Sequence, residues 1–393
     1  MMDCKALALE QKEYIIGLRR WFHAHPELGT QEIHTTARIV EELRADGIEV
    51  ETFPDITGCI GTLRGGRPGK TVMLRADIDA LPIQEADLTK PYASQNPGVM
   101  HACGHDCHTA MLLGAAKILA AHREEIPGTV KFIFQMAEEI GAEARRYVEK
   151  DCLNGIDAIF GMHIWTPLPS GRFNLEDGPR MASSDRFTIR IHGQAAHGSA
   201  PHQGKDAVLA AAAVVMALQS LVSRVNDPQN TFVLTTGVMN GGTRDNIIAP
   251  EAELIGTTRT FDKEFRKTVP DLIRKTACAA AEAYGCTADL DYFFGPAPVV
   301  NEHHELNEIA RNAAKDILGS DALISMDRQM GAEDFSTYME HVPGLFGFLG
   351  CCNEAKKDTA SPHHSTTFDV DEDVLPYGTA ITVHFAMDYL NQK

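Results

Sequence analysis

The sequence predicts an α/β protein, in which a central and mostly parallel sheet is clad by helices, with a smaller α+β domain inserted into it. Helical and strand patterns alternate up to Met181, which favours a parallel sheet. Beyond this point the order becomes βαββαβ, the pattern of a small ferredoxin-like sandwich. The first alternation then resumes. We therefore expect one domain built from residues 1–181 and 296–393, and a second domain built from residues 182–295.

Hydrophobic periodicity defines the elements of the first domain. An amphipathic helix runs through Leu18, and apolar residues at helical spacing predict a second helix over 35–46. The remaining elements follow in chain order: a strand over 71–75, a helix over 108–122, a strand over 129–135, a helix from 142 and a strand over 158–162. After the insertion come a helix over 304–318, a strand near 345–349 and a terminal helix from 375.

The inserted domain is predicted from a second set of periodic runs. Its expected elements are strands over 185–193, 231–239, 251–261 and 287–294, and helices over 206–224 and 263–284. The apolar stretch 207–218 is rich in Ala and shorter than the roughly 18 residues that a membrane span needs. We therefore expect it to be a buried helix, and we expect no membrane partner.

Composition excludes some classes of partner. The chain carries a formal net charge of -18, whereas proteins that bind nucleic acids use Lys and Arg to neutralise phosphates. We therefore expect no nucleic-acid partner. An acidic surface also repels anionic substrates, so a carboxylate ligand needs a local Arg, Lys or metal ion to hold it.

The cysteine count and the N-terminus predict a reducing, cytoplasmic location. No basic segment followed by an apolar run, as in a signal peptide, is evident at the start of the sequence. Nine cysteines is an odd number, and the adjacent Cys351 and Cys352 suit a disulfide framework poorly. In a reducing setting, a cysteine among histidines favours metal binding or catalysis.

The densest candidate site lies in the segment from His101 to His108, with three His and two Cys at the start of a predicted helix. Thiolate and imidazole bind zinc-like ions well. Cys103 and His105 are two residues apart with a Gly between them, so both side chains could turn toward one site. The alternative is a helix start that happens to be rich in His and Cys.

Further polar groups follow predicted strands. Glu138 and Glu139 come after a buried strand, His163 ends another, and His363 and His364 lie in a late loop. In α/β sheets, ligands bind beyond the carboxyl ends of the strands. One carboxylate of an adjacent pair can bind a metal while the other takes a proton from water. A single His or Glu pair is more often structural, but these groups together indicate a hydrolytic metal site.

Several motifs occur together in one order along nearly the whole chain. They are RADIDALPI, HACGHD, FQMAEE, GMHIWTPLPSG, HGQAAHGSAPHQGKDAV, GGTRDNIIAP, MGAEDF and HHSTTFDVDE. In this order they resemble the aminoacylase, hippurate hydrolase and auxin-conjugate hydrolase family of metallopeptidases. The resemblance implies a zinc-peptidase-like catalytic domain and an inserted lid or dimerisation domain. It also implies a homodimer, or a tetramer built from dimers.

The resemblance implies two divalent metal ions, with zinc expected first and manganese, cobalt or nickel as alternatives. The implied ligands are Cys103 as a bridging thiolate, His105, Glu139, His163 and one of the two late histidines. In relatives the last ligand lies four residues before an aromatic residue, and counting back from Phe368 selects His364 over His363.

The same resemblance implies roles for residues beside the metals. Glu138 would be the general base and later the acid, because it is the carboxylate of the pair that does not bind metal. Asp79 would orient the metal site, although a loop-capping role accounts for it equally well. Many related peptidases have a ligand histidine where this chain has Asp77, a departure typical of the cysteine-containing branch.

Further implied positions lie outside the metal cluster. His197 resembles a histidine that stabilises the oxyanion, often from the other subunit, whereas Asn246, Arg259 and Glu333 match positions near the substrate. Arg259 could hold a substrate carboxylate through two hydrogen bonds. The N-terminal segment 25–27 (HPE) also matches the family, and we interpret it as a structural turn.

The function expected from these features is hydrolysis of the amide bond of small N-acyl-L-amino acids, with acetyl or aromatic acyl groups. A dipeptidase or an N-acetyl-diaminopimelate deacetylase is the alternative within the same chemistry. From another class, the chain could be a non-catalytic metal-binding or peptide-binding protein. A binding protein has no need of the additional carboxylate of Glu138, which favours an enzyme.

Overall fold

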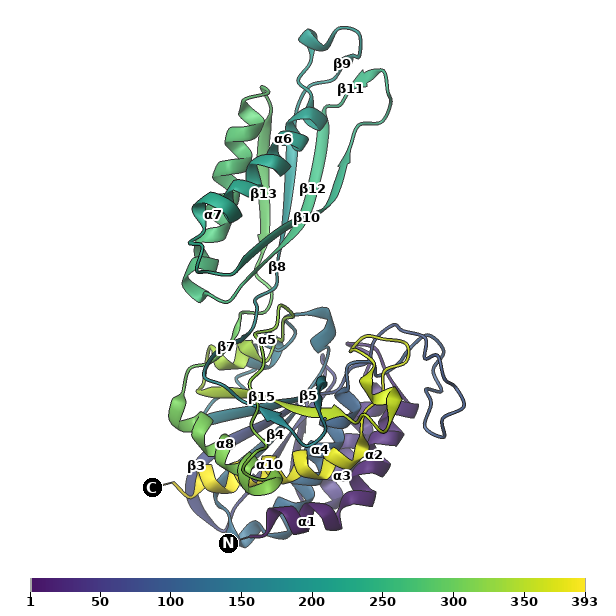
Figure 1. Cartoon of the computed structure of the whole chain (residues 1–393), viewed down its shortest axis with the longest axis vertical. Coiled ribbons are helices and arrows are strands. Elements are labelled where there is room, and N and C mark those ends of the chain that lie inside the picture. The colour runs from purple at the N-terminus through teal and green to yellow at the C-terminus, as the bar shows by residue number, and fades with distance from the viewer. Residues whose placement is uncertain (1, 393) are drawn as a thin grey trace. The chain divides into compact units, whose positions relative to one another are not determined.

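The computed structural model describes residues 2–392, which divide into two compact units (Figure 1). Unit 1 comprises the chain up to Gly178, Val300–Asp327 and the chain from Thr337. Unit 2 comprises Pro179–Val299 and Arg328–Ser336. The chain passes between the units at β7 (Gly178–Met181) and β14 (Val299–Asn301), and again on either side of segment 328–336.

Unit 2 runs from 179 to 299 where the sequence predicted 182 to 295, and one further segment differs from the expected division. Residues 328–336 were expected in the first domain, but they belong to unit 2. The Gln329 N–H donates to the Arg180 carbonyl at 2.8 Å, and the Ala182 N–H donates to the Gln329 carbonyl at 3.0 Å. These backbone bonds attach the segment to the start of unit 2.

A mixed sheet forms the centre of unit 1. In residues 2–392 it has seven strands in the order β1-β2-β4-β3-β5-β15-β6. The central strands are parallel, as expected: β3 (Arg67–Asp77), β4 (Pro127–Gln135), β5 (Ala158–Pro169) and β15 (Gly344–Cys352). Antiparallel strands that the sequence did not predict flank them: β1 (Glu49–Thr52), β2 (Cys59–Arg64) and β6 (Phe173–Asn174).

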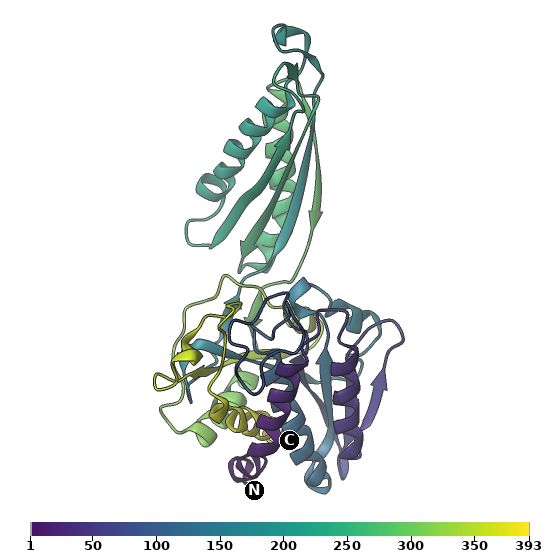
Figure 2. The ribbon, with the colours of Figure 1, turned by 90° about the vertical axis from the view of Figure 1, so that its right-hand side faces the viewer.

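Helices pack on both sides of this sheet (Figures 1 and 2). They are α1 (Cys4–Glu10), α2 (Lys12–Ala24), α3 (Ile33–Ala45), α4 (His105–Ala121), α5 (Arg145–Glu149), α8 (His304–Leu318), α9 (Ser336–Met339) and α10 (Leu375–Leu390). The single helix expected through Leu18 is two helices, α1 and α2, which meet at Gln11. Most side chains of α4 are buried, which makes this helix a rigid support for any residue at its first turn.

Unit 2 is an antiparallel sheet covered on one face by two helices (Figure 2). Its strands are β8 (Asp185–His192), β10 (Phe232–Gly241), β12 (Glu251–Thr260) and β13 (Thr287–Phe293), in the order β10-β12-β8-β13. The helices are α6 (Ala207–Ser220) and α7 (Lys263–Glu282), and a short pair, β9 (Ala196–His197) and β11 (Ile247–Ile248), lies beyond the sheet. This is the predicted βαββαβ arrangement.

Both long helices of unit 2 have a side-chain cap at the N-terminus. Asp206 accepts hydrogen bonds from the N–H groups of Val208 and Leu209, and Asp262 does the same at α7. An Asp at this position satisfies N–H groups that have no partner within the helix. The caps explain why the predicted helix starts at 206 and 263 fall within one residue of the observed starts.

The expectation that the apolar stretch at 207–218 is buried is wrong for one face of the helix. The helical segment Ala207–Val225 is apolar and long enough to cross a membrane by length and composition, but only 28% of it is buried in the structure. One face, which includes Val214 and Leu218, lies in the core of unit 2. The other face exposes Leu209 (51%) and Met216 (74%). Because the helix is rich in Ala, its sequence does not distinguish the buried face from the exposed face.

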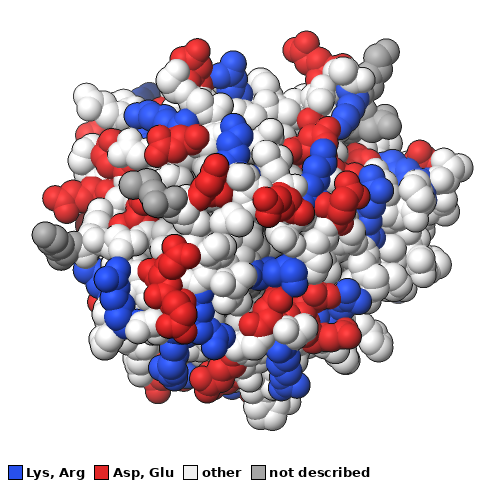
Figure 3. All heavy atoms as spheres, turned by 90° about the horizontal axis from the view of Figure 1, so that it is seen from below, with Lys and Arg blue, Asp and Glu red and all other residues white. Residues whose placement is uncertain are grey.

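On the face shown in Figure 3, acidic and basic side chains are interspersed. No continuous area of Lys and Arg is visible on this face, so the net charge of -18 is not offset there by a basic patch.

Candidate functional site

The site in unit 1 begins at a glycine whose backbone has a left-handed conformation, which residues with a Cβ atom rarely adopt. Gly104 has φ 102°, and a Cβ built there would lie 2.4 Å from the Cδ1 atom of Ile164. Any other residue would therefore be strained and would collide with β5. This turn places Cys103 just before α4 and His105 in its first turn, so both side chains face the end of β5.

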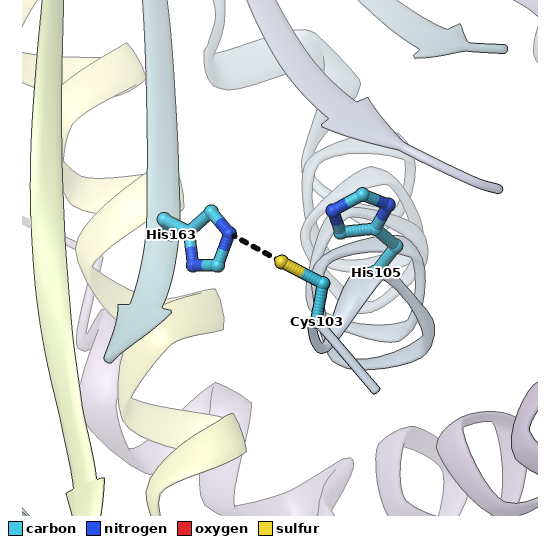
Figure 4. A group of neighbouring side chains, drawn as sticks. All are labelled: Cys103, His105 and His163. Atoms are coloured by element: carbon cyan, nitrogen blue, oxygen red, sulfur yellow. Dashed lines mark hydrogen bonds between the residues drawn. The ribbon is translucent and has the colours of Figure 1, made fainter. Parts of the chain in front are cut away.

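Cys103, His105 and His163 form one group of side chains that could hold a metal ion (Figure 4). Their ligand atoms all lie within 4.8 Å of one another. The Cys103 Sγ atom points toward His163 and lies 3.4 Å from its Nε2 atom. Two ligands of one tetrahedral zinc ion are roughly 3.3–3.8 Å apart, given metal–ligand bonds of about 2.0–2.3 Å. The spacing of the thiol and imidazole therefore fits a shared cation.

Asp79 orients His105. The Nδ1 atom of His105 lies 3.0 Å from the Asp79 carbonyl oxygen and 3.1 Å from its Oδ1 atom. With its proton on Nδ1, the ring presents the lone pair of Nε2 to the cluster. That Nε2 atom is buried and has no hydrogen-bond partner among residues 2–392. Such an atom fits a metal ligand.

Glu139 and His364 complete a second group with Cys103. Their ligand atoms and Sγ also lie within 4.8 Å of one another, and the His364 Nε2 atom lies 3.2 Å from Glu139 Oε1. Cys103 therefore belongs to both groups. A thiolate shared by two groups of ligands is the arrangement that a bridging ligand between two cations requires.

The two late histidines have different surroundings. His363 uses both ring nitrogens within the protein: Nδ1 faces the Cys103 carbonyl oxygen at 3.1 Å, and Nε2 accepts the Thr166 N–H at 3.2 Å. Its ring also stacks on Trp165. His364, in contrast, directs Nε2 to Glu139. Of the two, His364 therefore has the ring nitrogen that faces the cluster, and its choice over His363 as a ligand stays a prediction.

His108 and Asp77 lie beside the cluster and form a different group with His105. His108 donates from Nδ1 to Asp77 at 2.5 Å and accepts the Ile164 N–H on Nε2 at 2.9 Å. Both nitrogens are therefore occupied. Asp77 also accepts a hydrogen bond from Arg75 at 2.7 Å. These contacts make the pair a support for the cluster.

The electrostatics of the cluster favour positive charge at its centre. Burial opposes protonation of His105, yet Asp77, Asp79 and Glu139 raise its pKa to about 10. Burial, together with Glu139 and Glu138, raises the pKa of the Cys103 thiol well above its usual value. A divalent cation would supply positive charge, ionise the thiol and displace the imidazole proton. These residues therefore fit a metal centre.

Glu138 lies beside the cluster as well. Its carboxylate forms a third group with His105 and Glu139, again within 4.8 Å. The N–H groups of Glu138 and Glu139 donate to the two carboxylate oxygens of Asp79, at 3.1 and 3.0 Å. The sequence left two roles open for Asp79, a cap of a loop and a residue that orients the site. In the structure Asp79 has both contacts, because it caps this turn and orients His105.

The structure places two further candidates together in unit 2. His197, in β9, pairs with Ile247 of β11, and the adjacent Gly198 N–H donates to the Asn246 carbonyl at 2.8 Å. His197 is exposed, and its Nδ1 atom accepts the Ser199 N–H at 3.1 Å. Both candidates lie beyond the β12 end that starts at residue 251.

Arg259 and Glu333 lie elsewhere in unit 2. Arg259 is eight residues along β12 from Glu251, roughly 25 Å at the rise of a strand. It is therefore not grouped with His197 within the unit. Its guanidinium donates to the Thr258 carbonyl at 3.0 Å. Glu333 is buried and accepts the Phe335 N–H at 2.9 Å.

Sequence reasoning missed Glu32 and Tyr147, which contact the turn that carries Glu138 and Glu139. Ala137 donates its N–H to Glu32 at 2.8 Å, and Met136 donates its N–H to the Tyr147 hydroxyl at 3.1 Å. Glu32 looks like an ordinary acidic residue at a helix start, and Tyr147 like a core aromatic. No local pattern in the sequence separates them from such residues.

Replacing His363 or His364 with alanine tests which of the two histidines is the metal ligand. His364→Ala should lower the bound divalent metal from two ions per chain to one or fewer, because it removes an unshared imidazole from the cluster. His363→Ala should keep two ions with weaker affinity, because it removes a support and no ligand. Equilibrium dialysis against zinc, followed by metal analysis, measures both. The reverse pattern would make His363 the ligand.

Comparison with known proteins places the chain in a family. A family model for peptidase family M20/M25/M40 matches residues 73–388. The chain is 42% identical to N-acetylcysteine deacetylase of Bacillus subtilis (strain 168), over 95% of each chain. It is 38% identical to thermostable carboxypeptidase 2 of Saccharolobus solfataricus, over 98% of this chain and 97% of the relative.

A solved structure supports the same conclusion. The crystal structure of a dinuclear metal binding peptidase of the M20 family from Bacillus subtilis has a TM-score of 0.85 at 37% identity. The match covers 99% of this chain and 100% of the chain in that crystal structure. The fold, the cluster of ligand side chains and these matches agree: the chain belongs to peptidase family M20/M25/M40 and is a hydrolase.

Proposed function

We propose that this hydrolase cleaves the amide bond of N-acyl-L-amino acids at a centre of two divalent cations. The observation that carries the proposal is the position of Glu138, a carboxylate beside two groups of ligand side chains that share Cys103. A site that only stored metal would not need this additional acid. Hydrolysis does need it, because water must lose a proton and the leaving amine must gain one.

We assign the cations to two sets of ligands. Cys103 with His105 and His163 would hold one ion, and Cys103 with Glu139 and His364 would hold the other. When bound, the pair supplies Lewis-acid polarisation of the amide carbonyl and makes water acidic near neutral pH. Thiolate, imidazole and carboxylate together favour zinc, and manganese, cobalt and nickel are the alternatives.

The residues of the chain then move the proton. Glu138 takes it from the attacking water as the oxygen bonds to the amide carbon. The same carboxyl group delivers it to the amide nitrogen, so that the carbon–nitrogen bond breaks and the amine leaves neutral. Asp79 fixes the backbone of Glu138 through Oδ1, which keeps the carboxylate within reach of the reacting atoms.

The two compared relatives indicate one class of substrate. An N-acetylamino acid carries a free carboxylate beside the amide bond that a deacetylase cuts. The C-terminal residue of a peptide likewise carries one beside the bond that a carboxypeptidase cuts. We propose that Arg259 binds this carboxylate and that Glu333 contacts the same substrate. Asn246 lies beside His197, so we propose that it contacts the substrate in the site of a partner subunit. Burial lowers the pKa of the Arg259 guanidinium from its usual value, yet this side chain remains a cation at neutral pH.

A substrate panel separates the alternatives. The purified chain, loaded with zinc or manganese, is expected to release amino acid from N-acetyl- and N-benzoyl-L-amino acids faster than from dipeptides, peptides or N-acetyl-diaminopimelate. Amide analogues without the free carboxylate should be poor substrates. Release is measured with an amine reagent. Preference for peptides would make the chain a peptidase, and no cleavage with any metal would refute the proposal.

Removal of the proposed base is the second test. Glu138→Ala should keep both metal ions but lower kcat at least about a hundredfold, the usual effect of removing a general base. Glu149→Ala is a matched control, because Glu149 is an exposed glutamate of the nearby α5. Metal content and kcat are measured for both variants. Equal activity in Glu138→Ala would exclude this residue as the base.

We also propose that the chain forms homodimers through unit 2, alone or within a tetramer. The exposed face of α6 offers Leu209 and Met216, and β10 is an edge strand with Val233 and Met239 exposed. Exposed apolar side chains beside an unpaired strand edge favour association with a second copy. His197, which lies beyond the end of β12 opposite to Arg259, could then stabilise the oxyanion in the partner's site.

Mixed dimers test this exchange of residues. His197→Ala and Glu138→Ala should each be nearly inactive as homodimers. Dissociated and mixed in equal amounts, they should recover roughly a quarter of wild-type activity, because half of the dimers then contain one complete site. Light scattering checks the dimer mass. No recovery from dimers that have exchanged would place His197 and Glu138 in the same chain's site or exclude His197.

The remaining proposals concern location and partners. All nine cysteines lie within residues 2–392 and are free thiols. Free thiols are typical of proteins from a reducing compartment, so we propose a cytoplasmic location. The substrate that we propose is a small molecule, and the acidic net charge supports the proposal that the chain has no nucleic-acid partner.

A further inference from the structure

Glu32 is a buried carboxylate that the proposed mechanism does not use. It lies immediately before α3 and has an exposed fraction of 0%. Its Oε1 atom accepts the Ala137 N–H at 2.8 Å, and its Oε2 atom accepts the Thr57 hydroxyl at 2.5 Å. Burying a carboxylate is costly unless both oxygens are hydrogen-bonded, as they are here. The hydrogen-bond partners of Glu32 therefore indicate which part of the chain it stabilises.

Its main partner, Ala137, has an uncommon backbone conformation. Ala137 has φ 56° and ψ 40°, in the left-handed region that residues with a Cβ atom disfavour. It lies between the end of β4 and the two glutamates. A right-handed or extended Ala137 would turn the following residues away from their present positions.

Four consecutive N–H groups of this turn bond to buried side chains from distant segments. Met136 donates to the Tyr147 hydroxyl, Ala137 to Glu32, and the two glutamates to the two oxygens of Asp79. Asp79 and Tyr147 hold the two ends of the turn. Among residues 2–392, Glu32 is the side chain that holds the left-handed residue itself.

We propose that Glu32 is a positioning residue for the hydrolytic reaction. By holding Ala137 in the left-handed conformation, it directs Glu139 to the metal ligands and keeps Glu138 beside them as the base. The inference rests on the proposed function, because it assigns Glu32 a role through Glu138. It extends that function to a residue on the far side of the turn, which contacts neither metal ligand nor substrate.

A purely structural role for Glu32 is the alternative, and a nearby residue provides the control. Glu27 precedes the same helix, and its two oxygens accept the N–H groups of His34 and Thr35, at 3.1 and 2.8 Å. These bonds cap α3, as expected for a structural turn, and do not reach Ala137. Loss of Glu27 should therefore weaken the same region without moving the two glutamates.

A conservative replacement separates geometry from charge. Glutamine at position 32 can accept the Ala137 N–H on its amide oxygen and donate from its amide nitrogen to Thr57. Burial, with a contribution from Asp79, raises the pKa of Glu32 to about 7. A neutral side chain is thus compatible with this site. Alanine removes both bonds.

The experiment compares wild type, Glu32→Ala, Glu32→Gln, Glu27→Ala and Thr57→Val. Each full-length protein is loaded with cobalt, and four quantities are measured: metal content, the visible absorption spectrum of the cobalt, kcat and KM on an N-acetyl-L-amino acid, and Tm. Thr57→Val removes one bond to Glu32 and remains informative if Glu32→Ala does not fold.

We expect Glu32→Ala to lower kcat about a hundredfold, the scale of a displacement of roughly 1 Å in an active site. KM should change little, the cobalt spectrum should shift, and Glu32→Gln should restore both kcat and spectrum. Thr57→Val should lower kcat by a smaller factor. Glu27→Ala should lower Tm but leave kcat and spectrum near wild type. Loss of cobalt in Glu32→Ala alone would also support the proposal, because the same turn carries Glu139.

Three results would overturn the inference. They are wild-type kcat and spectrum in Glu32→Ala, equal losses of kcat in Glu27→Ala at the same loss of Tm, and a Glu32→Gln variant as poor as Glu32→Ala. If Glu32→Ala does not fold, wild-type kcat and spectrum in Thr57→Val would overturn it. A wild-type protein that binds cobalt but cleaves none of the N-acyl substrates would instead refute the proposed function.

Discussion

The site depends on the hydrogen bonds that the carboxylate of Asp79 makes. Asp79 follows β3 and joins three segments: its oxygens accept the N–H groups of Glu138 and Glu139 after β4, and they face Nδ1 of His105 at the start of α4. One buried group thus orients the ring of a candidate ligand and fixes the backbone of the proposed base. Because β3 and β4 are parallel neighbours, this contact is available only at their carboxyl ends.

The sequence predicted that polar residues after several strands gather at one edge of the sheet, because the rule for parallel strands needs only the residues that follow each strand. The order of the strands came from the structure. The sequence could not predict which nitrogen atoms are already occupied. His105, His108 and His163 look alike in sequence, yet His108 donates to Asp77 and accepts from Ile164, whereas Nε2 of His105 has no hydrogen-bond partner in the described chain. Only coordinates separate a supporting histidine from a ligand.

Two other differences have physical causes of the same kind. The exposed face of α6 was missed because alanine suits both a core and a surface, so the periodic signal of an amphipathic helix is weak. Segment 328–336 was assigned to the wrong unit because the contacts that attach it join residues far apart in the sequence. They are backbone bonds to residues 180 and 182, and the Arg328 guanidinium over the Phe261 ring. Local patterns in the sequence do not report such contacts.

The turn at Ala137 shows why so many buried groups surround two glutamates. The left-handed conformation costs an alanine about 1 kcal/mol, and a glycine there would avoid that cost. Glycine would also let the turn adopt other conformations, so its carboxylates would be less fixed. The opposing residue is glycine instead: a Cβ on Gly29 would lie 3.2 Å from the Ala137 Cβ. The chain thus leaves space for the Ala137 methyl group on one side and holds its N–H with Glu32 on the other. Strain at one residue is accepted because the surrounding contacts leave Glu138 and Glu139 in one arrangement.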